Sequence, residues 1–252
     1  MTDNILFERN DNIARLVLNN PDKHNALGEA ELSGLQQHLD AIESDPDLRV
    51  LVVTGRGDKT FCAGAALHQL GSGQISGDFF QETTDRLASV RIPSVCALNG
   101  SVFGGGVELA LSCDFRIGIH GSRLRVPAAR IGLCYPISGI NRFVERLGVN
   151  LAKRLLVGAE EFDANAMLDI GFLDQLVAPE RLEAAVAETT ERIAGLAPLA
   201  VQAMKAILQQ AAAGEIDMST AMALSRQCAE SNDLQEGFAA QRDKRPPRFT
   251  GS

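Results

Sequence analysis

The chain has 252 residues, 45% of them hydrophobic and 22% charged, with a formal net charge of −8. This composition is typical of a globular protein with ample core, and the acidic balance argues against nucleic acid or a membrane surface as the main partner. The N-terminal MTDNILFERNDN lacks a basic segment followed by an apolar run, and no stretch approaches the ~20 apolar residues of a membrane span. A cytoplasmic location is therefore expected.

Strand-like and helical patterns alternate through the first two-thirds of the chain. Short β-branched or apolar runs predict strands at Ala14–Asn20, Arg49–Gly55, Ser94–Gly100 and Leu173–Ala178, and a pair hinged at Gly121 within residues 114–127. Helical spacing of apolar residues between the first two strands predicts a helix with one buried face, carrying Leu32, Leu35, Leu39 and Ile42.

Strand patterns disappear after about Pro179. Four successive helical patterns follow, at residues 180–196, 197–214, 217–231 and 233–244. Their Ala- and Met-rich sequences suit packing on the chain's own core or on another subunit. The coarse architecture is thus a mixed β/α core followed by an all-helical region.

The cysteines and histidines form no metal or disulfide pattern. Five cysteines occur without a CxxC motif, at positions Cys62, Cys96, Cys113, Cys134 and Cys228. An odd number at irregular spacing fits buried reduced thiols, and we interpret Cys134 as a small core residue. The four histidines are dispersed, at His24, His38, His68 and His120, so no metal site is expected.

Four ordered segments carry a family resemblance. They are LNNPDKHNAL (18–27), FCAGAAL (61–67), NGSVFGGGVELALSCD (99–114) and EGFAAQRDKRPPRF (236–249). Through them the sequence resembles the crotonase superfamily, of enoyl-CoA hydratase/isomerase type, over nearly its whole length. The resemblance implies an α/β fold with a β-β-α spiral core at residues 1–195 and a helical oligomerisation region at residues 196–252. It also implies an acyl-CoA substrate, no cofactor beyond that coenzyme A moiety, and a homotrimer or homohexamer.

The family comparison gives catalytic roles to three residues here, and to a fourth position that has lost its catalytic group. The backbone N–H groups of Ala65 and Gly105 would receive the negative charge of the thioester oxygen, and Gly105 would lie at a helix N-terminus, which favours an anion. Glu108 matches the first of two family glutamates and would act as general acid or base. The position of the second glutamate is occupied by Ala128, which can neither take nor give a proton.

Tyr135, the only tyrosine in the chain, brings alternatives. Tyr-x-x-Ser-Gly-Ile also resembles the branch that contains methylmalonyl-CoA decarboxylase, although that enzyme has a histidine at the position of Ala65. The tyrosine could orient a carboxylate, deliver a proton or line the acyl pocket. The main hypothesis is an enoyl-CoA hydratase/isomerase-type reaction. The alternatives are decarboxylation of a malonyl-type acyl-CoA, or binding of acyl-CoA without catalysis.

Coenzyme A would be held by backbone and charge. By family analogy, carbonyls near Ala26 and Ala63 receive the adenine amino group, and Lys23 and His24 lie near the nucleotide phosphates. Lys244 matches a lysine that meets the nucleotide, including from a neighbouring subunit. The second segment adds the remaining expected coenzyme A contacts, at Ala65, Ala66 and Leu67.

Overall fold

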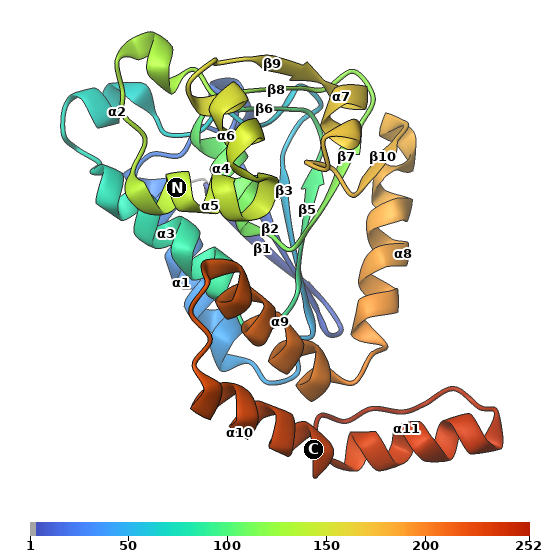
Figure 1. Ribbon diagram of the computed structural model, residues 1–252. Coiled ribbons are helices and arrows are strands. Elements are labelled where there is room, and N and C mark those ends of the chain that lie inside the picture. The colour runs from blue at the N-terminus through green and yellow to red at the C-terminus, as the bar shows by residue number, and fades with distance from the viewer. Residues whose placement is uncertain (1–3) are drawn as a thin grey trace.

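The computed structural model describes residues 4–252 and has a mixed α/β architecture with two sheets (Figure 1). The larger sheet has the order β1 (Ile5–Asn10), β2 (Ile13–Leu18), β3 (Val50–Gly55), β5 (Ser94–Leu98), β7 (Phe115–Ile119) and β10 (Gln175–Val177). Its β1–β2 pair is antiparallel and its other pairs are parallel. The smaller sheet has the order β4 (Thr60–Cys62), β6 (Ser101–Phe103), β8 (Arg123–Arg125) and β9 (Glu161–Asp163).

A β-β-α unit repeats along the core. In each repeat the first strand joins the larger sheet, the second joins the smaller sheet, and a helix follows. The helices that close the three repeats are α3 (Gly77–Ser89), α4 (Gly105–Ser112) and α5 (Ile137–Leu147). Because β3, β5 and β7 are neighbours, and so are β4, β6 and β8, the repeats wind as a spiral, as the family resemblance implies. The further helices of this part are α1 (Glu29–Ser44), α2 (Leu67–Gly71), α6 (Val149–Leu156), α7 (Ala164–Asp169) and α8 (Leu182–Ala194).

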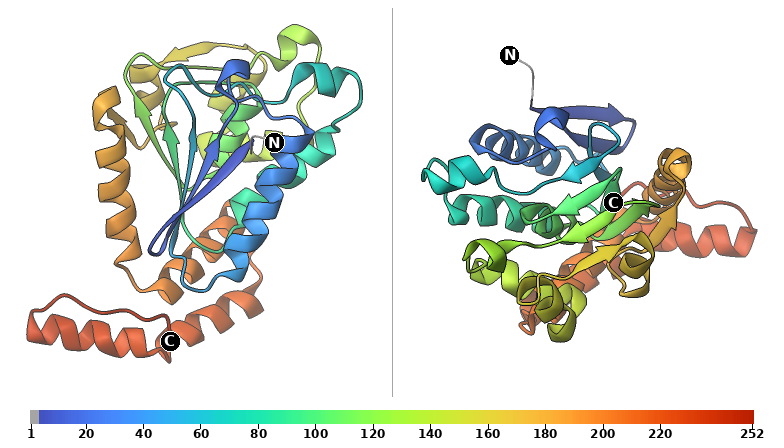
Figure 2. Two further views of the ribbon diagram at one scale, coloured as in Figure 1. Left: turned by 180° about the vertical axis from the view of Figure 1, so that it is seen from behind. Right: turned by 90° about the horizontal axis from the view of Figure 1, so that it is seen from above.

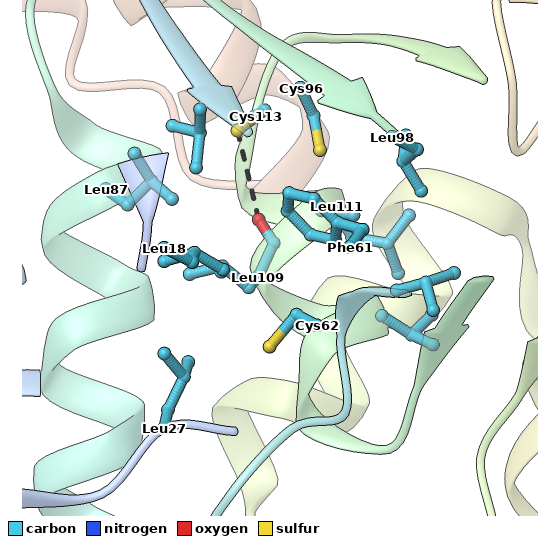
Figure 3. Close-up of a cluster of buried hydrophobic side chains, with 14 of the residues drawn as sticks. Leu18, Leu27, Phe61, Cys62, Leu87, Cys96, Leu98, Leu109, Leu111 and Cys113 are labelled. Atoms are coloured by element: carbon cyan, nitrogen blue, oxygen red, sulfur yellow. Dashed lines mark hydrogen bonds between the residues drawn. The ribbon is translucent and has the colours of Figure 1, made fainter. Parts of the chain in front are cut away.

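The larger sheet is buried on both faces, as parallel sheets generally are. Along β3, Leu51 and Val53 point into one core while Val50 and Val52 point into the other. The first core lies beneath α1, α3, α4 and α5, and Figure 3 shows it around Phe61, Leu109 and Leu111. The second core lies beneath α8. All four residues of the predicted α1 stripe are buried, which confirms that helix.

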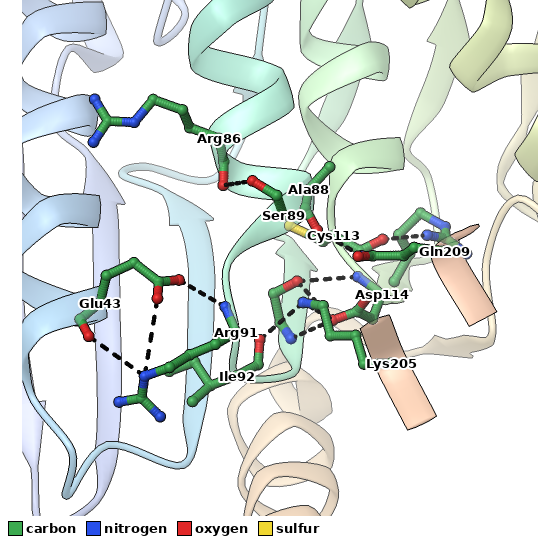
Figure 4. Close-up of polar contacts among 12 residues, drawn as sticks. Glu43, Arg86, Ala88, Ser89, Arg91, Ile92, Cys113, Asp114, Lys205 and Gln209 are labelled. Atoms are coloured by element: carbon green, nitrogen blue, oxygen red, sulfur yellow. Dashed lines mark hydrogen bonds and ion pairs between the residues drawn. The ribbon is translucent and has the colours of Figure 1, made fainter. Parts of the chain in front are cut away.

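The C-terminal region consists of α9 (Pro198–Ala213), α10 (Met218–Ala229) and α11 (Asn232–Asp243). Helix α9 is attached to the core by a buried ion pair. Lys205 Nζ lies 2.7 Å from Asp114 Oδ2 and donates to the carbonyl of Ile92 at 2.8 Å (Figure 4). Helices α10 and α11 extend away from the sheets (Figure 2). The division at residue 195 falls between α8 and α9, and its role in assembly stays a prediction.

Two sequence-based interpretations change with the structure. Gly121 lies between two strands as predicted, but β7 and β8 belong to different sheets. Cys134 is exposed, so the interpretation as a core residue was wrong; it lies in a loop before α5 and not on an element facing a core. Cys62, Cys96 and Cys113 are buried and free, and Cys228 is half-buried and free.

In residues 4–252 no helix combines the length and apolarity needed to cross a membrane.

Candidate active site

The glycine-rich segment makes a sharp turn from β6 into α4. Gly104 has φ 52° and ψ −127°, a backbone conformation that is essentially restricted to glycine. Helix α4 begins at Gly105, directly after this turn. The backbone at the turn and helix start is therefore free of side chains on three successive residues, Gly104 to Gly106, and its first N–H groups have no partner within the helix.

Ala65 presents a second backbone donor to the same space. A parallel bridge between Leu27 and Ala65 uses the carbonyl of Gly64 and the N–H of Ala66, at 2.8 and 2.9 Å from their partners in Leu27. The N–H of Ala65 therefore points away from Leu27. Within residues 4–252 neither it nor the N–H of Gly105 donates a hydrogen bond. Both residues line one cavity of ≈ 140 Å³.

Glu108 brings a carboxylate to this cavity from the first turn of α4. Its side chain is 1% exposed, and Oε1 accepts a hydrogen bond of 3.0 Å from the hydroxyl of Thr84 on α3. Burial raises the pKa of Glu108 above its ordinary value, while the Arg142 guanidinium and the Thr84 hydrogen bond act in the opposite direction. A raised pKa suits a carboxyl group that gains and loses a proton near neutral pH.

Tyr135 lines the cavity beside Glu108. A Cβ atom at Gly139 would lie 2.8 Å from the Tyr135 ring and 3.0 Å from Glu108 Oε2, so the absence of a side chain there gives both groups room. The Tyr135 hydroxyl is buried and has no hydrogen-bond partner of normal geometry in the described chain. Burial, followed by the charge of Glu108, raises the pKa of Tyr135 well above its usual value, so the phenol stays protonated.

The rest of the cavity wall is apolar. Ala128 lies in it at the start of a 3₁₀ turn, Ala128–Ile131, so the position of the second family glutamate faces the cavity but carries no proton-transferring group. Among the described lining residues only Glu108 and Tyr135 titrate. The other lining residues of the wall are Ala63, Leu67, Leu70, Gly77, Phe80, Gly104, Pro127, Ile131, Leu133 and Pro136. The arrangement can hold an apolar acyl group with its carbonyl against two donors and one carboxyl group.

Comparison with known proteins decides the family. The sequence profile described as "Enoyl-CoA hydratase/isomerase" matches residues 8–252. The chain belongs to this enoyl-CoA hydratase/isomerase family. It is 32% identical to a crotonyl-CoA hydratase of Syntrophomonas wolfei over 98% of both chains. It is 29% identical to a short-chain-enoyl-CoA hydratase of Clostridium acetobutylicum, over 96% of this chain and 95% of that one.

A solved structure supports the same family fold. The enoyl-CoA hydratase/carnithine racemase from Magnetospirillum magneticum superimposes with a TM-score of 0.92 at 27% identity. The match covers 100% of this chain and 97% of that one. The crotonase-type fold expected from the sequence is therefore confirmed.

The residues expected to contact coenzyme A fall into two groups: those between Lys23 and Leu67, which lie near one another, and Lys244, which lies elsewhere. The segment that holds Ala26 runs beside the segment that holds Ala63, because the Ala63 N–H donates to the carbonyl of His24 at 3.0 Å. The carbonyls of Ala26 and Ala63 accept no hydrogen bond within the described residues, so they remain available. Lys23 and His24 are exposed nearby. Leu67 lines the cavity, whereas Ala66 does not.

Lys244 is not part of this group within one chain. It caps α11 with φ 49°, and in Figure 1 α11 lies at the end of the molecule opposite α2. A contact between Lys244 and coenzyme A therefore requires another subunit, and it stays a prediction.

Sequence reasoning missed the residues that surround Glu108 from other elements. Thr84 belongs to α3 and Arg142 to α5, and α3 also carries Phe80, which lines the cavity against Gly105. A signal for α3 was present, because Ser76 caps it by accepting from the Phe79 N–H at 3.0 Å and Phe80, Thr84 and Leu87 follow at helical spacing. The roles of Thr84 and Arg142 depend on how α3, α4 and α5 pack, which local patterns do not contain.

Proposed function

We propose that this protein catalyses a hydratase/isomerase-type reaction on the acyl group of a coenzyme A thioester. The observation that carries the proposal is the meeting of two unpartnered backbone donors, at Ala65 and Gly105, with the buried carboxyl group of Glu108 in one apolar cavity. The two N–H groups would bind the thioester oxygen as it becomes an enolate. The cavity volume of ≈ 140 Å³ favours a short acyl group.

Glu108 is the proposed proton carrier. In hydration, its carboxylate takes a proton from water while the water oxygen bonds to the β-carbon. The electrons of the double bond move onto the thioester oxygen. The enolate then collapses, and the protonated Glu108 returns its proton to the α-carbon. A single carboxyl group thus serves both steps, which is how a chain with Ala128 at the second glutamate position could still add water.

The family relatives support this choice of substrate, because the printed names of two of them describe hydratases of crotonyl-CoA and of short-chain enoyl-CoA. Crotonyl-CoA is therefore the first substrate to test, by loss of its ultraviolet absorbance. Glu108→Gln should lower turnover by roughly 10²–10⁴-fold with substrate binding retained. Tyr135→Phe should cost much less. A Glu108→Gln enzyme that hydrates at the wild-type rate would contradict the mechanism.

Decarboxylation of a malonyl-type acyl-CoA remains the second candidate. It is favoured by the buried hydroxyl of Tyr135, which makes no hydrogen bond of normal geometry in the described chain although it lies beside Glu108, and which could donate to a substrate carboxylate. Release of carbon dioxide from methylmalonyl-CoA, with Tyr135→Phe more damaging than Glu108→Gln, would select it. Tight binding of thioesters without turnover across a substrate panel would instead select the non-catalytic alternative. Assembly and cytoplasmic location stay predictions.

A further inference from the structure

A hydrogen-bond network connects Glu108 to an arginine that does not line the cavity. Arg142 on α5 is 8% exposed, and its guanidinium reaches α3 and α4 together. Nη1 donates to the carbonyl of Thr84 at 3.2 Å and to the hydroxyl of Ser112 at 2.8 Å. Nη2 forms an ion pair with Asp85. One cation therefore joins the two helices that carry Glu108 and its hydrogen-bond donor.

Two of these three partners of Arg142, Thr84 and Ser112, contact Glu108 directly. The Thr84 hydroxyl lies 3.0 Å from Glu108 Oε1, and the Ser112 hydroxyl donates to the backbone carbonyl of Glu108 at 2.8 Å. The first contact fixes the end of the side chain and the second fixes its base on α4. Arg142 is thus one residue removed from Glu108 along two separate routes.

The Thr84 hydroxyl has a choice of acceptors. It lies 2.9 Å from the carbonyl of Gln81 and 3.0 Å from Glu108 Oε1, and it carries only one proton. When Glu108 is ionised, that proton can be donated to Oε1. When Glu108 is protonated, the carboxyl group can donate to the Thr84 oxygen while the Thr84 proton turns to Gln81. The contact therefore survives in either protonation state.

We propose that Arg142 and Thr84 are positioning residues for the proton-carrying step: Arg142 holds α3 and α4 in register, and Thr84 keeps the Glu108 carboxyl group in place whether or not it carries a proton. The inference rests on the proposed function, in which Glu108 must cycle between the two states. It assigns no contact with substrate to either residue.

The charged and polar groups around Glu108 determine the direction in which its pKa should move when Arg142 or Thr84 is replaced. Burial raises the Glu108 pKa, and so does the charge of Asp85 on α3, whereas Arg142 on α5 and hydrogen bonds from the hydroxyl groups of Thr84 on α3 and Tyr135 before α5 lower it. Cys62 on β4 faces Tyr135, and burial raises the pKa of its thiol to about 12, so it remains neutral. The contact between Thr84 and Glu108 exists in both protonation states, but it is stronger when Glu108 is ionised, because the bond is then charge-assisted. Removing Arg142 or the Thr84 hydroxyl should therefore raise the Glu108 pKa.

The decisive variant is Thr84→Val, with Thr83→Val as its matched control. Both threonines are fully buried on α3, but the Thr83 hydroxyl bonds Phe79 and Gln36 and does not reach Glu108. In Thr84→Val the acidic limb of the pH profile of kcat/KM should move up by roughly half to one pH unit. Turnover should fall about tenfold with little change in KM. Thr83→Val should leave both unchanged, and Thr84→Ser, which keeps a hydroxyl, should restore the wild-type limb.

Arg142→Gln provides a second test against Arg146→Gln, a control one helical turn further along α5. Arg142→Gln should move the limb in the same direction as Thr84→Val, whereas Arg146→Gln should not. If Arg142→Gln fails to fold, the Thr84 pair alone decides the inference. An unchanged limb in Thr84→Val, or an equal shift in Thr83→Val, would overturn it.

Infrared difference spectra separate this inference from the proposed function. The signal of the protonated Glu108 carboxyl group, identified by its loss in Glu108→Gln, can be titrated without any substrate. A titration that moves up in Thr84→Val supports the positioning role even if no thioester is turned over, in which case the proposed function alone fails. Thioester turnover that depends on Glu108, with a titration that does not move in Thr84→Val, overturns the positioning role alone.

Discussion

A Cβ atom at Gly64 would lie 2.4 Å from the backbone nitrogen of Gly105. The two glycines come from different β-β-α repeats, and Gly64 immediately precedes the other proposed donor, Ala65. Gly64 has φ +87°, which favours glycine on conformational grounds as well. Its missing side chain therefore keeps the Gly105 N–H accessible, so the pair of donors depends on a residue that donates nothing itself.

The first prediction is that Gly64→Ala removes activity by covering the Gly105 N–H. Loss of one such donor should lower turnover by at least about 100-fold. The left-handed backbone should also cost roughly 1–2 kcal/mol of folding stability, and the backbone around Gly105 N and Phe103 O, which lie 2.4 and 2.9 Å from the new Cβ, must shift as well. Gly121→Ala is the matched control, because Gly121 has φ +84° and nothing within 4 Å of its would-be Cβ. Thioester turnover and urea unfolding of both variants provide the measurement. Equal turnover in the two would contradict the proposed role of the Gly105 N–H.

Much of the fold could be predicted where a pattern is long enough to repeat. Helix α1 was predicted from four apolar residues on one face, and the helices of the C-terminal region from similar spacing. Strands β4, β6, β8 and β9 have three residues each, too few for most to show an alternating pattern. The separation of β7 and β8 into different sheets depends on strand partners far along the chain, which the local turn at Gly121 does not encode.

The residues of the candidate site show the same difference between those that a local pattern reveals and those that long-range packing brings together. Gly105 and Glu108 could be found because they share one short segment with a helix start, and Ala65 because its segment resembles a family motif. Thr84 and Arg142 are 24 and 34 residues from Glu108 in the sequence, and they become its neighbours only through the packing of three helices. An interior threonine and an arginine on amphipathic helices have no local feature that distinguishes them from ordinary core and surface residues.

The second prediction concerns pH and stability at Glu108. Its pKa is raised mainly by burial, so the folded state binds its proton more tightly than the unfolded state does. Wild-type stability should therefore fall as pH rises from the ordinary glutamate range through the raised pKa, by about 1.4 kcal/mol for each unit of elevation. Glu108→Gln removes this cost.

The measurement is the melting temperature of wild type and Glu108→Gln from pH 4 to pH 8. The variant should gain on the wild type with rising pH, and the two should converge at the acidic end. Glu236→Gln is a control of opposite sign at the acidic end, because Arg245 lowers the pKa of Glu236 to about 2. Its difference from wild type should change only as pH falls through the ordinary glutamate range, and should stay constant toward pH 8. A difference between wild type and Glu108→Gln that does not change with pH would be evidence against a raised Glu108 pKa.

The third prediction concerns the attachment of α9 to the core. Lys205 and Asp114 are both largely buried, and Asp114 Oδ2 also accepts from the N–H of Ser94 at 2.8 Å. Lys205→Met leaves that carboxylate without its cation and should lower the free energy of unfolding by about 3–5 kcal/mol. Adding Asp114→Asn should recover part of the loss. The exposed pair of Arg181 and Glu188 supplies the control, since Arg181→Ala should change stability by less than about 1 kcal/mol.

Urea unfolding of these variants at one fixed subunit concentration tests the third prediction, because assembly would otherwise alter apparent stability. A Lys205→Met loss no larger than that of Arg181→Ala would show that α9 is held by its apolar contacts alone.

The last prediction is that the C-terminal helices assemble the chain into a trimer or a hexamer. Large apolar side chains are exposed on all three helices, with Leu208 68% exposed on α9, Met222 58% on α10 and Phe238 60% on α11. Such a series on neighbouring helices is typical of a surface that another subunit covers. Light scattering should give a mass of about three or six chains, as closed symmetry allows.

Leu208→Glu should lower the measured mass, because the new carboxylate would be buried without a partner at the interface. Val157→Glu is the control: Val157 is 76% exposed but follows α6, outside the C-terminal helices, so its replacement should leave the mass unchanged. A monomer at micromolar concentration would refute the prediction. It would also leave Lys244 without a route to coenzyme A, because within one chain α11 lies at the opposite end of the molecule from α2, which begins at Leu67 of the cavity wall.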